Sequence, residues 1–202
     1  MTLAQTSFAL QAQSYLQRLQ SCFTAENLDG VETLAQALRQ AWVDGRQVFI
    51  CGNGGSAANA LHMANDLHYG IGACGPSPKL PGLRVEALPA NSSVITCLAN
   101  DTGYDNIYAH QLDVKARAQD VLIVLSGSGN SANVIRALET ATNLSMTSFS
   151  IVAFTGGRCR ELADVAIHFA VDDMQIAEDT QLVVGHLCMQ WLNANKPDHI
   201  KR

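Results

Sequence analysis

The sequence predicts an α/β protein with a doubly wound, mainly parallel five-stranded sheet, flanked by helices and preceded by N-terminal helices. After position 46, five short apolar runs rich in β-forming residues alternate with segments of helical apolar spacing. Before position 46, the apolar residues recur only at helical spacing. Because strands that alternate with helices form parallel sheets with right-handed crossovers, helices are expected on both faces of the sheet.

The first part of the chain is predicted to form two helices between about Thr2 and Trp42. Residues 27–30 (NLDG) fit either a turn or the start of the second helix, and Gly45 fits its stop. The apolar residues at helical spacing are Leu16, Leu19, Phe23, Val31, Leu34, Leu38, Ala41 and Trp42.

The remainder is predicted to be one αβ unit. Residues 70–82 (GIGACGPSPKLPG) are rich in Gly and Pro and are expected to form a surface loop, and residues 175–195 a long, largely buried terminal helix. We therefore expect a single domain over 1–202, with a helical segment at 1–45 and the core at 46–202. The predicted strands are QVFIC at 47–51, RVEAL at 84–88, VLIVL at 121–125, FSIVAF at 149–154 and AIHFAV at 166–171.

The composition is that of a globular chain, with 48% hydrophobic and 15% charged residues. A net charge of -5 without long basic runs predicts no direct binding to nucleic acid. The chain has no apolar stretch of about 18 residues and no secretory signal, which predicts a cytoplasmic protein that does not bind membranes. Its six cysteines form no C-x-x-C pair and are expected to be buried, reduced thiols.

The first strand runs directly into a glycine loop, Gly52–Ser56 (GNGGS), and a helix is predicted to follow. Glycines permit close backbone approach, and the free N–H groups at a helix N-terminus attract an anion. The spacing of Gly52, Gly54 and Ala57 also satisfies the G-x-G-x-x-A dinucleotide fingerprint. That fingerprint expects an acidic residue about 20 positions on, whereas Glu86 lies further away and inside its strand, so a dinucleotide site is disfavoured.

A second glycine loop, Ser126–Ser131 (SGSGNS), follows the strand VLIVL and precedes another helical segment. Its three hydroxyls can satisfy the oxygens of one phosphate monoester, and the missing G-K-[ST] argues against a nucleoside triphosphate. Either loop alone fits a tight turn with a Ser N-cap equally well. Two such loops on neighbouring parallel strands converge on one crevice, which predicts a shared phosphate site.

These loops, with the helix AANALHMANDL at 57–67, resemble those of the sugar isomerase (SIS) family. Further matches are AND at 99–101, TGG at 155–157 and GH at 185–186, so the resemblance covers nearly the whole chain. It is nearest to the phosphoheptose isomerase branch, whose relatives include the DnaA-initiator-associating protein. The resemblance implies the SIS fold, a phosphorylated sugar as ligand, and a homotetramer with its sites at subunit interfaces.

The resemblance also assigns residues to the ligand. Asn91 and Gln175 stand where the isomerases usually have aspartates near the sugar, which puts heptose specificity in question. The residues expected to bind the substrate are Asn53, Gly54, Ser56, Asn91, Ser126, Ser128, Ser131 and Gln175.

Four further side chains are of the types that aldose–ketose isomerisation requires. His62 and Asp66 are spaced i and i+4 on the first helix of the core, and Glu178 and His186 lie in the terminal helix. The reaction needs a base to move a proton between adjacent carbons, and an acid or a metal to polarise the carbonyl. The resemblance implies Asp66 as the base, His186 as the acid, and all four as a set that can hold zinc.

Two of the four depart from the family, since Asp66 replaces a glutamate and Glu178 replaces a glutamine. Aspartate is one methylene shorter, which matters at a precision of roughly 1 Å, whereas a second carboxylate favours a divalent metal. Structural interpretations also stay open: His62 with Asp66 as a surface pair, and His186 as a core histidine bonded to a carbonyl.

The leading hypothesis is an isomerase that converts a ketose phosphate into an aldose phosphate, with sedoheptulose 7-phosphate and D-glycero-D-manno-heptose 7-phosphate as the pair. The alternative is a non-catalytic SIS protein that senses a sugar phosphate or bridges a partner protein, which the substituted acidic positions suggest.

Overall fold

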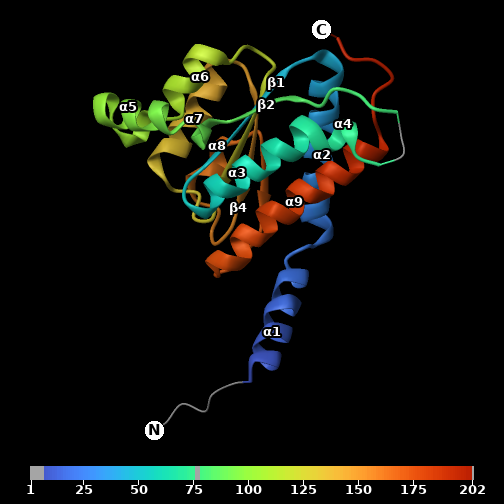
Figure 1. Cartoon of the computed structure of the whole chain (residues 1–202). Helices are drawn as coiled ribbons and strands as arrows, with labels where there is room; N and C mark the ends of the chain where they lie inside the picture. Colours follow the sequence, from blue (N-terminus) through green and yellow to red (C-terminus); the bar gives the residue numbers. More distant parts are fainter. Residues whose placement is uncertain (1–6, 76–77, 202) are drawn as a thin grey trace.

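The computed structural model describes residues 7–75 and 78–201 (Figure 1). It confirms the α/β architecture: two helices precede a sheet whose strands alternate with helices. The helices are α1 (Phe8–Ser21), α2 (Ala25–Asp44), α3 (Gly55–Asn65), α4 (Ile71–Ala73), α5 (Ser92–Thr102), α6 (Ala109–Lys115), α7 (Ala132–Asn143), α8 (Gly157–Leu162) and α9 (Met174–Ala194). The strands are β1 (Gln47–Gly52), β2 (Arg84–Ala87), β3 (Val121–Ser126), β4 (Thr147–Val152) and β5 (Val165–His168). Three short helical segments complete the fold: η1 (Asp66–Gly70), η2 (Leu88–Ala90) and η3 (Tyr104–Asn106).

The five strands form one sheet in the order β2-β1-β3-β4-β5, and every pairing is parallel. The order reverses between β1 and β3, because the chain passes from β1 to one edge and then returns to the other side of β1. In open α/β sheets, ligands bind at the carboxyl ends of the strands at this switch point. The two predicted glycine loops follow β1 and β3, so both lie at the switch point.

Helices cover both faces of the sheet, as predicted, and the central strands β1, β3 and β4 are buried on both sides (Figure 1). Side chains of β1 alternate between the faces: Val48 and Ile50 join the core under α2, α3 and α9, whereas Phe49 and Cys51 join the core under α6 and α7. Burial of both faces explains why the strands are continuous apolar runs in the sequence.

Local signals at the ends of α2 agree with the sequence analysis. The Thr24 side chain accepts from the Asn27 N–H while the Asn27 side chain accepts from the Thr24 N–H, which forms a capping box. Residues 27–30 therefore belong to the helix start and not to a turn. Gly45 ends the helix in the left-handed conformation, with φ +66°.

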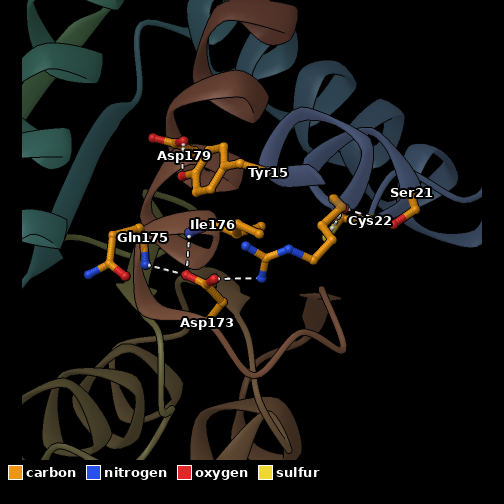
Figure 2. Close-up of polar contacts among 8 residues, drawn as sticks. Tyr15, Ser21, Cys22, Asp173, Gln175, Ile176 and Asp179 are labelled. Carbon is orange, nitrogen blue, oxygen red and sulfur yellow. Dashed lines mark hydrogen bonds and ion pairs between the residues drawn. The ribbon is translucent and has the colours of Figure 1, made fainter. Parts of the chain in front are cut away.

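Helix α1 extends away from the body of the molecule, and none of its residues is buried (Figure 1). Two polar contacts connect it to the start of α9: the Tyr15 hydroxyl donates to Asp179, and Arg18 pairs with Asp173 at 2.7 Å (Figure 2). Burial and the Asp179 carboxylate raise the pKa of Tyr15 to about 12. The part of the predicted helix at residues 2–6 lies outside the described residues.

Three predictions needed correction. Gly70 and residues 71–73 are helical, because the helix that carries Asp66 continues through a π-helical turn; within the predicted loop, residues 76–77 lie outside the described residues. Strand β4 starts two residues earlier than expected, at Thr147, and β5 ends at His168.

The prediction that all six cysteines are buried, reduced thiols is confirmed only in part. All six are free thiols, but Cys74 and Cys97 are exposed and Cys22 is half-buried. Burial raises the pKa of Cys159 and of Cys188 to about 12. Among the described residues, no helix is both long and apolar enough to span a bilayer.

Candidate active site

The first glycine loop is shaped by close contacts at the carboxyl end of β1. A Cβ at Gly52 would lie 2.7 Å from the carbonyl oxygen of Leu125 on β3, so only glycine fits where the two strands separate. Gly54 adopts φ +56° and precedes the first turn of α3. Ser56 lies in that turn and is buried, with 4% of its surface exposed. The loop therefore places the N-terminus of α3 at the switch point of the sheet.

The second glycine loop is held by its own hydroxyls. Ser126 Oγ accepts from the Gly129 N–H at 3.1 Å, and Ser128 Oγ accepts from the Asn130 N–H at 3.3 Å. These bonds are those expected of a tight turn, but each hydroxyl keeps its own hydrogen for donation to a ligand. Ser131 precedes α7 and makes no capping hydrogen bond with its side chain.

A third loop, the TGG segment at 155–157, packs against the second glycine loop. Gly129 has φ +67°, and a Cβ there would overlap the carbonyl oxygen of Gly156. The Asn130 side chain accepts from the Arg158 N–H at 3.1 Å, which joins the second glycine loop to the start of α8. The loop backbone is therefore fixed by contacts within one chain.

Three of the four predicted acid, base and metal residues lie together. The Nε2 atoms of His62 and His186 are 3.0 Å apart, and Asp66 Oδ2 lies 3.5 Å from His62 Nε2 and 3.7 Å from His186 Nε2. His62 belongs to α3, Asp66 to the π-helical turn that continues it, and His186 to α9. The helical spacing predicted the first pair, and packing of α9 on α3 adds the third residue.

Gly185 explains why α9 can bring His186 so close to α3. A Cβ at this position would lie 2.7 Å from Met63 Cγ, so a larger residue would separate the two helices. In the GH pair at 185–186, Gly185 therefore allows α9 to approach α3 closely, and His186 supplies a side chain that can bind a metal.

The cluster of His62, Asp66 and His186 is open to solvent. Its side chains are 49%, 20% and 46% exposed, respectively. The interpretation of His186 as a core histidine is therefore wrong. Because the two rings share a hydrogen bond, one Nε2 carries hydrogen and the other accepts it, so the pair holds a transferable proton beside a carboxylate.

Glu178 lies outside this cluster. It precedes His186 by eight residues, and a rise of 1.5 Å per residue separates their backbones by about 12 Å along α9. Its carboxylate instead lies against Gly55 at the start of α3, in the space that a Cβ on Gly55 would need. Within one chain, the expected set of four metal ligands is therefore a set of three.

Asn91 and Gln175 are both exposed, and each sits at the start of a helix. The Asn91 side chain caps α5 by accepting from the Val94 N–H at 3.2 Å. Gln175 lies in the first turn of α9, where its backbone N–H donates to Asp173 (Figure 2). Neither side chain shares a hydrogen bond with the three-residue cluster among the described parts of the chain.

Comparison with known proteins places this arrangement in a family. The family model described as "SIS domain" matches residues 13–156. The chain belongs to the SIS domain family. The chain is 33% identical over 184 residues to a phosphoheptose isomerase of Chlorobaculum parvum, covering 90% of this chain and 86% of that one. It is 37% identical over 159 residues to a phosphoheptose isomerase of Mycobacterium bovis, covering 79% of each chain.

Solved structures agree with the sequence relatives. The phosphoheptose isomerase GmhA from Neisseria gonorrhoeae superposes with a TM-score of 0.83 and 25% sequence identity, covering 92% of this chain and 96% of that one. The SIS fold predicted from the two glycine loops is therefore confirmed.

The cluster in this SIS domain fits a zinc ion. Tetrahedral zinc with nitrogen and oxygen ligands at 2.0–2.2 Å places those ligands about 3.3–3.6 Å from one another. The three distances in the cluster, 3.0, 3.5 and 3.7 Å, bracket that range. Two histidines and one carboxylate leave a fourth position open, which is typical of catalytic zinc sites.

Sequence analysis missed two polar side chains of the SIS crevice. Asn133 on α7 exchanges hydrogen bonds of 2.8 Å with Asn53, and the Tyr104 hydroxyl donates to Asn53 at 3.0 Å. The only signal for Asn133 was its position two residues after Ser131, where an amphipathic helix would bury it.

Proposed function

We propose that this SIS domain is a sugar-phosphate isomerase that converts sedoheptulose 7-phosphate into D-glycero-D-manno-heptose 7-phosphate. Two observations carry the proposal: the cluster of His62, Asp66 and His186, and the two glycine loops at the carboxyl ends of the paired strands β1 and β3. The relatives that cover most of the chain are phosphoheptose isomerases, which supports this substrate pair.

In this proposal the phosphate binds at the carboxyl ends of β1 and β3. Hydroxyls of the second loop and the free N–H groups at the start of α3 and α7 would donate to the phosphate oxygens. Asn53 and Gly54 would line the adjoining part of the crevice, with Asn91 and Gln175 nearer the sugar. The phosphate-binding hydroxyls would be those of Ser56, Ser126, Ser128 and Ser131.

Asp66 and His186 would carry the proton transfers. Asp66 takes a proton from C1 of the ketose while His186 donates a proton to the C2 carbonyl oxygen, which gives an enediol. Asp66 then returns its proton to C2, and the O1 hydroxyl gives its proton back to His186. No atom is gained or lost, and both residues end in their starting state.

Zinc is the metal that this cluster would hold, through His62, Asp66 and His186, and it would then replace the proton of His186 as the group that polarises the carbonyl. When bound, the ion would polarise the oxygens of the substrate and stabilise negative charge on them.

The free thiols at all six cysteines suit a reducing compartment, which supports a cytoplasmic location.

A homotetramer with its sites at subunit interfaces is part of the proposal. Leu61 and Leu187 flank the two histidines and are 43% and 39% exposed, and Phe8 on α1 is 84% exposed. An isomerase must protect its enediol from water, and a 14-residue helix is marginally stable alone. A second copy that covered these surfaces would meet both requirements.

Two variants separate an isomerase from a sensor of sugar phosphates. Asp66→Asn removes the proposed base, so turnover of sedoheptulose 7-phosphate should fall about 10²- to 10⁴-fold while calorimetry still detects its binding. Ser128→Ala removes one phosphate donor, so binding should weaken first. If Asp66→Asn and wild type have equal turnover, the proposed chemistry is wrong.

A further inference from the structure

Asn53 and Asn133 form a reciprocal amide pair that joins the first glycine loop to α7. Asn53 Nδ2 donates to Asn133 Oδ1 and Asn133 Nδ2 donates to Asn53 Oδ1, both at 2.8 Å. Asn53 belongs to the first glycine loop and Asn133 to α7, which follows the second. Asn133 is 1% exposed, so this contact is shielded from water.

A backbone group determines which way both amides face. The N–H of Val134 donates to Asn133 Oδ1 at 3.0 Å, and an N–H can only donate, so this oxygen is fixed. Asn133 must then offer its Nδ2 to Asn53, which requires the oxygen of Asn53 on that side. The contact with Asn133 on α7 thus determines the orientation of the Asn53 amide.

Tyr104 uses the remaining acceptor capacity of Asn53. Its hydroxyl donates to Asn53 Oδ1 at 3.0 Å, so both lone pairs of this oxygen are engaged. Asn53 keeps one Nδ2 hydrogen that no described residue accepts, because the other bonds to Asn133. Asn53 can therefore only donate to a ligand.

We propose that Asn133 is a positioning residue that, together with Tyr104, makes Asn53 an obligate hydrogen-bond donor to an acceptor oxygen of the substrate. The proposal rests on the proposed function for the identity of that substrate. Tyr104 is 54% exposed and donates its only hydrogen to Asn53, so its oxygen is left to accept from a sugar hydroxyl. Asn53 as a donor and Tyr104 as an acceptor thereby distinguish acceptor from donor atoms on the ligand.

The direct test is Asn133→Asp, which keeps the shape of the side chain but replaces the N–H donor by a carboxylate oxygen. This oxygen would repel Asn53 Oδ1, so the reciprocal pair should open and the Asn53 amide should no longer be held in its donor orientation. We expect the KM for sedoheptulose 7-phosphate to rise about 10-fold at pH 8, in line with one lost hydrogen bond, with kcat changed less than 3-fold.

A pH series separates positioning from packing. When the introduced carboxyl is protonated, it can donate to Asn53 again, and burial raises the pKa of a carboxyl. The ratio of variant to wild-type KM should therefore fall towards one between pH 8 and pH 5. A ratio that stays constant, or a KM equal to wild type throughout, would overturn the proposal.

Two controls keep the outcome interpretable. Asn143→Asp makes the same change at an exposed position of α7 and should leave KM unchanged. Tyr104→Phe removes only a hydroxyl from an exposed ring, so it should fold normally and raise KM about 3-fold, within the range for a single neutral hydrogen bond. An unchanged KM in Tyr104→Phe would contradict the role given to Tyr104.

One measurement is independent of turnover. In ¹⁵N-labelled wild-type protein, the two side-chain amide hydrogens of Asn53, assigned by their loss in Asn53→Ser, should exchange with solvent at clearly different rates. Equal, fast exchange would overturn the positioning proposal even if the protein is an isomerase. Unequal exchange in a protein that does not turn over sedoheptulose 7-phosphate would support positioning and refute the proposed function.

Discussion

The proposed phosphate end, at the two glycine loops, and the proposed acid–base end, at His62, Asp66 and His186, are built in different ways. At the phosphate end, the glycine loops are held by buried groups of the same chain, among them Ser126 and Asn133 at 7% and 1% exposure. At the acid–base end, His62 and His186 stand on the surfaces of two helices with about half of each side chain exposed. In the proposed function, ligand binding would thus be organised within one chain, whereas the chemistry would take place at a surface that a second copy could cover.

The difference extends to what each end requires of the backbone. The phosphate end depends on glycines whose Cβ would strike a carbonyl oxygen, so its shape changes little without a large cost. The acid–base end depends on the distance between α3 and α9, to which the close contact of Gly185 with Met63 and the hydrogen bonds of Asn59 to α9 contribute. Substitutions at the two ends should therefore have separable effects.

The largest expected effect concerns metal binding at the acid–base end. Asp66→Asn removes the carboxylate of the three-residue cluster and should weaken zinc binding at least 100-fold, more than the 10- to 100-fold typical of losing an outer partner. Glu178→Gln should leave zinc affinity unchanged, because Glu178 lies against Gly55 and outside the cluster. Competition with a fluorescent chelator measures the zinc affinity of both variants. Equal losses of zinc affinity would contradict the prediction that only Asp66 belongs to the cluster.

A smaller effect is expected from the glycine of the phosphate end. Gly129→Ala places a Cβ against the Gly156 carbonyl at a positive φ, which should cost about 1–3 kcal/mol of stability and abolish detectable binding of sedoheptulose 7-phosphate. Gly45→Ala is a matched control, because it has φ +66° and overlaps the carbonyl of Lys201 away from the crevice. Thermal unfolding should show similar losses for both, and calorimetry should show lost binding for Gly129→Ala alone. Retained binding there would argue that the second loop does not hold the phosphate.

Much of the architecture could be predicted from the sequence because its signals are local. Strands buried on both faces are continuous apolar runs, and the residues of the two glycine loops are adjacent in the chain. The pair of His62 and Asp66 followed from i, i+4 spacing, which the π-helical turn at Asp66 preserves.

What escaped prediction depends on tertiary packing. The eight-residue spacing of Glu178 and His186 along one helix already separates their backbones, whereas how α9 lies against α3 decides which of the two meets His62. Asn133 joins Asn53 only after β1 and β3 pair, so no sequence spacing between positions 53 and 133 could reveal it. The exposure of Cys74 and Cys97 likewise follows from which helix faces meet the core.

In the proposed function, this SIS domain isomerises a heptose phosphate with the cluster of His62, Asp66 and His186. The most direct measurement is NMR-monitored turnover of sedoheptulose 7-phosphate by the purified protein, with and without added zinc, beside His186→Gln. We expect new aldose signals with the wild-type protein and their loss in the variant. Clear binding of sedoheptulose 7-phosphate without any aldose signal, in the presence of zinc, would contradict the proposed function and identify a sugar-phosphate sensor instead.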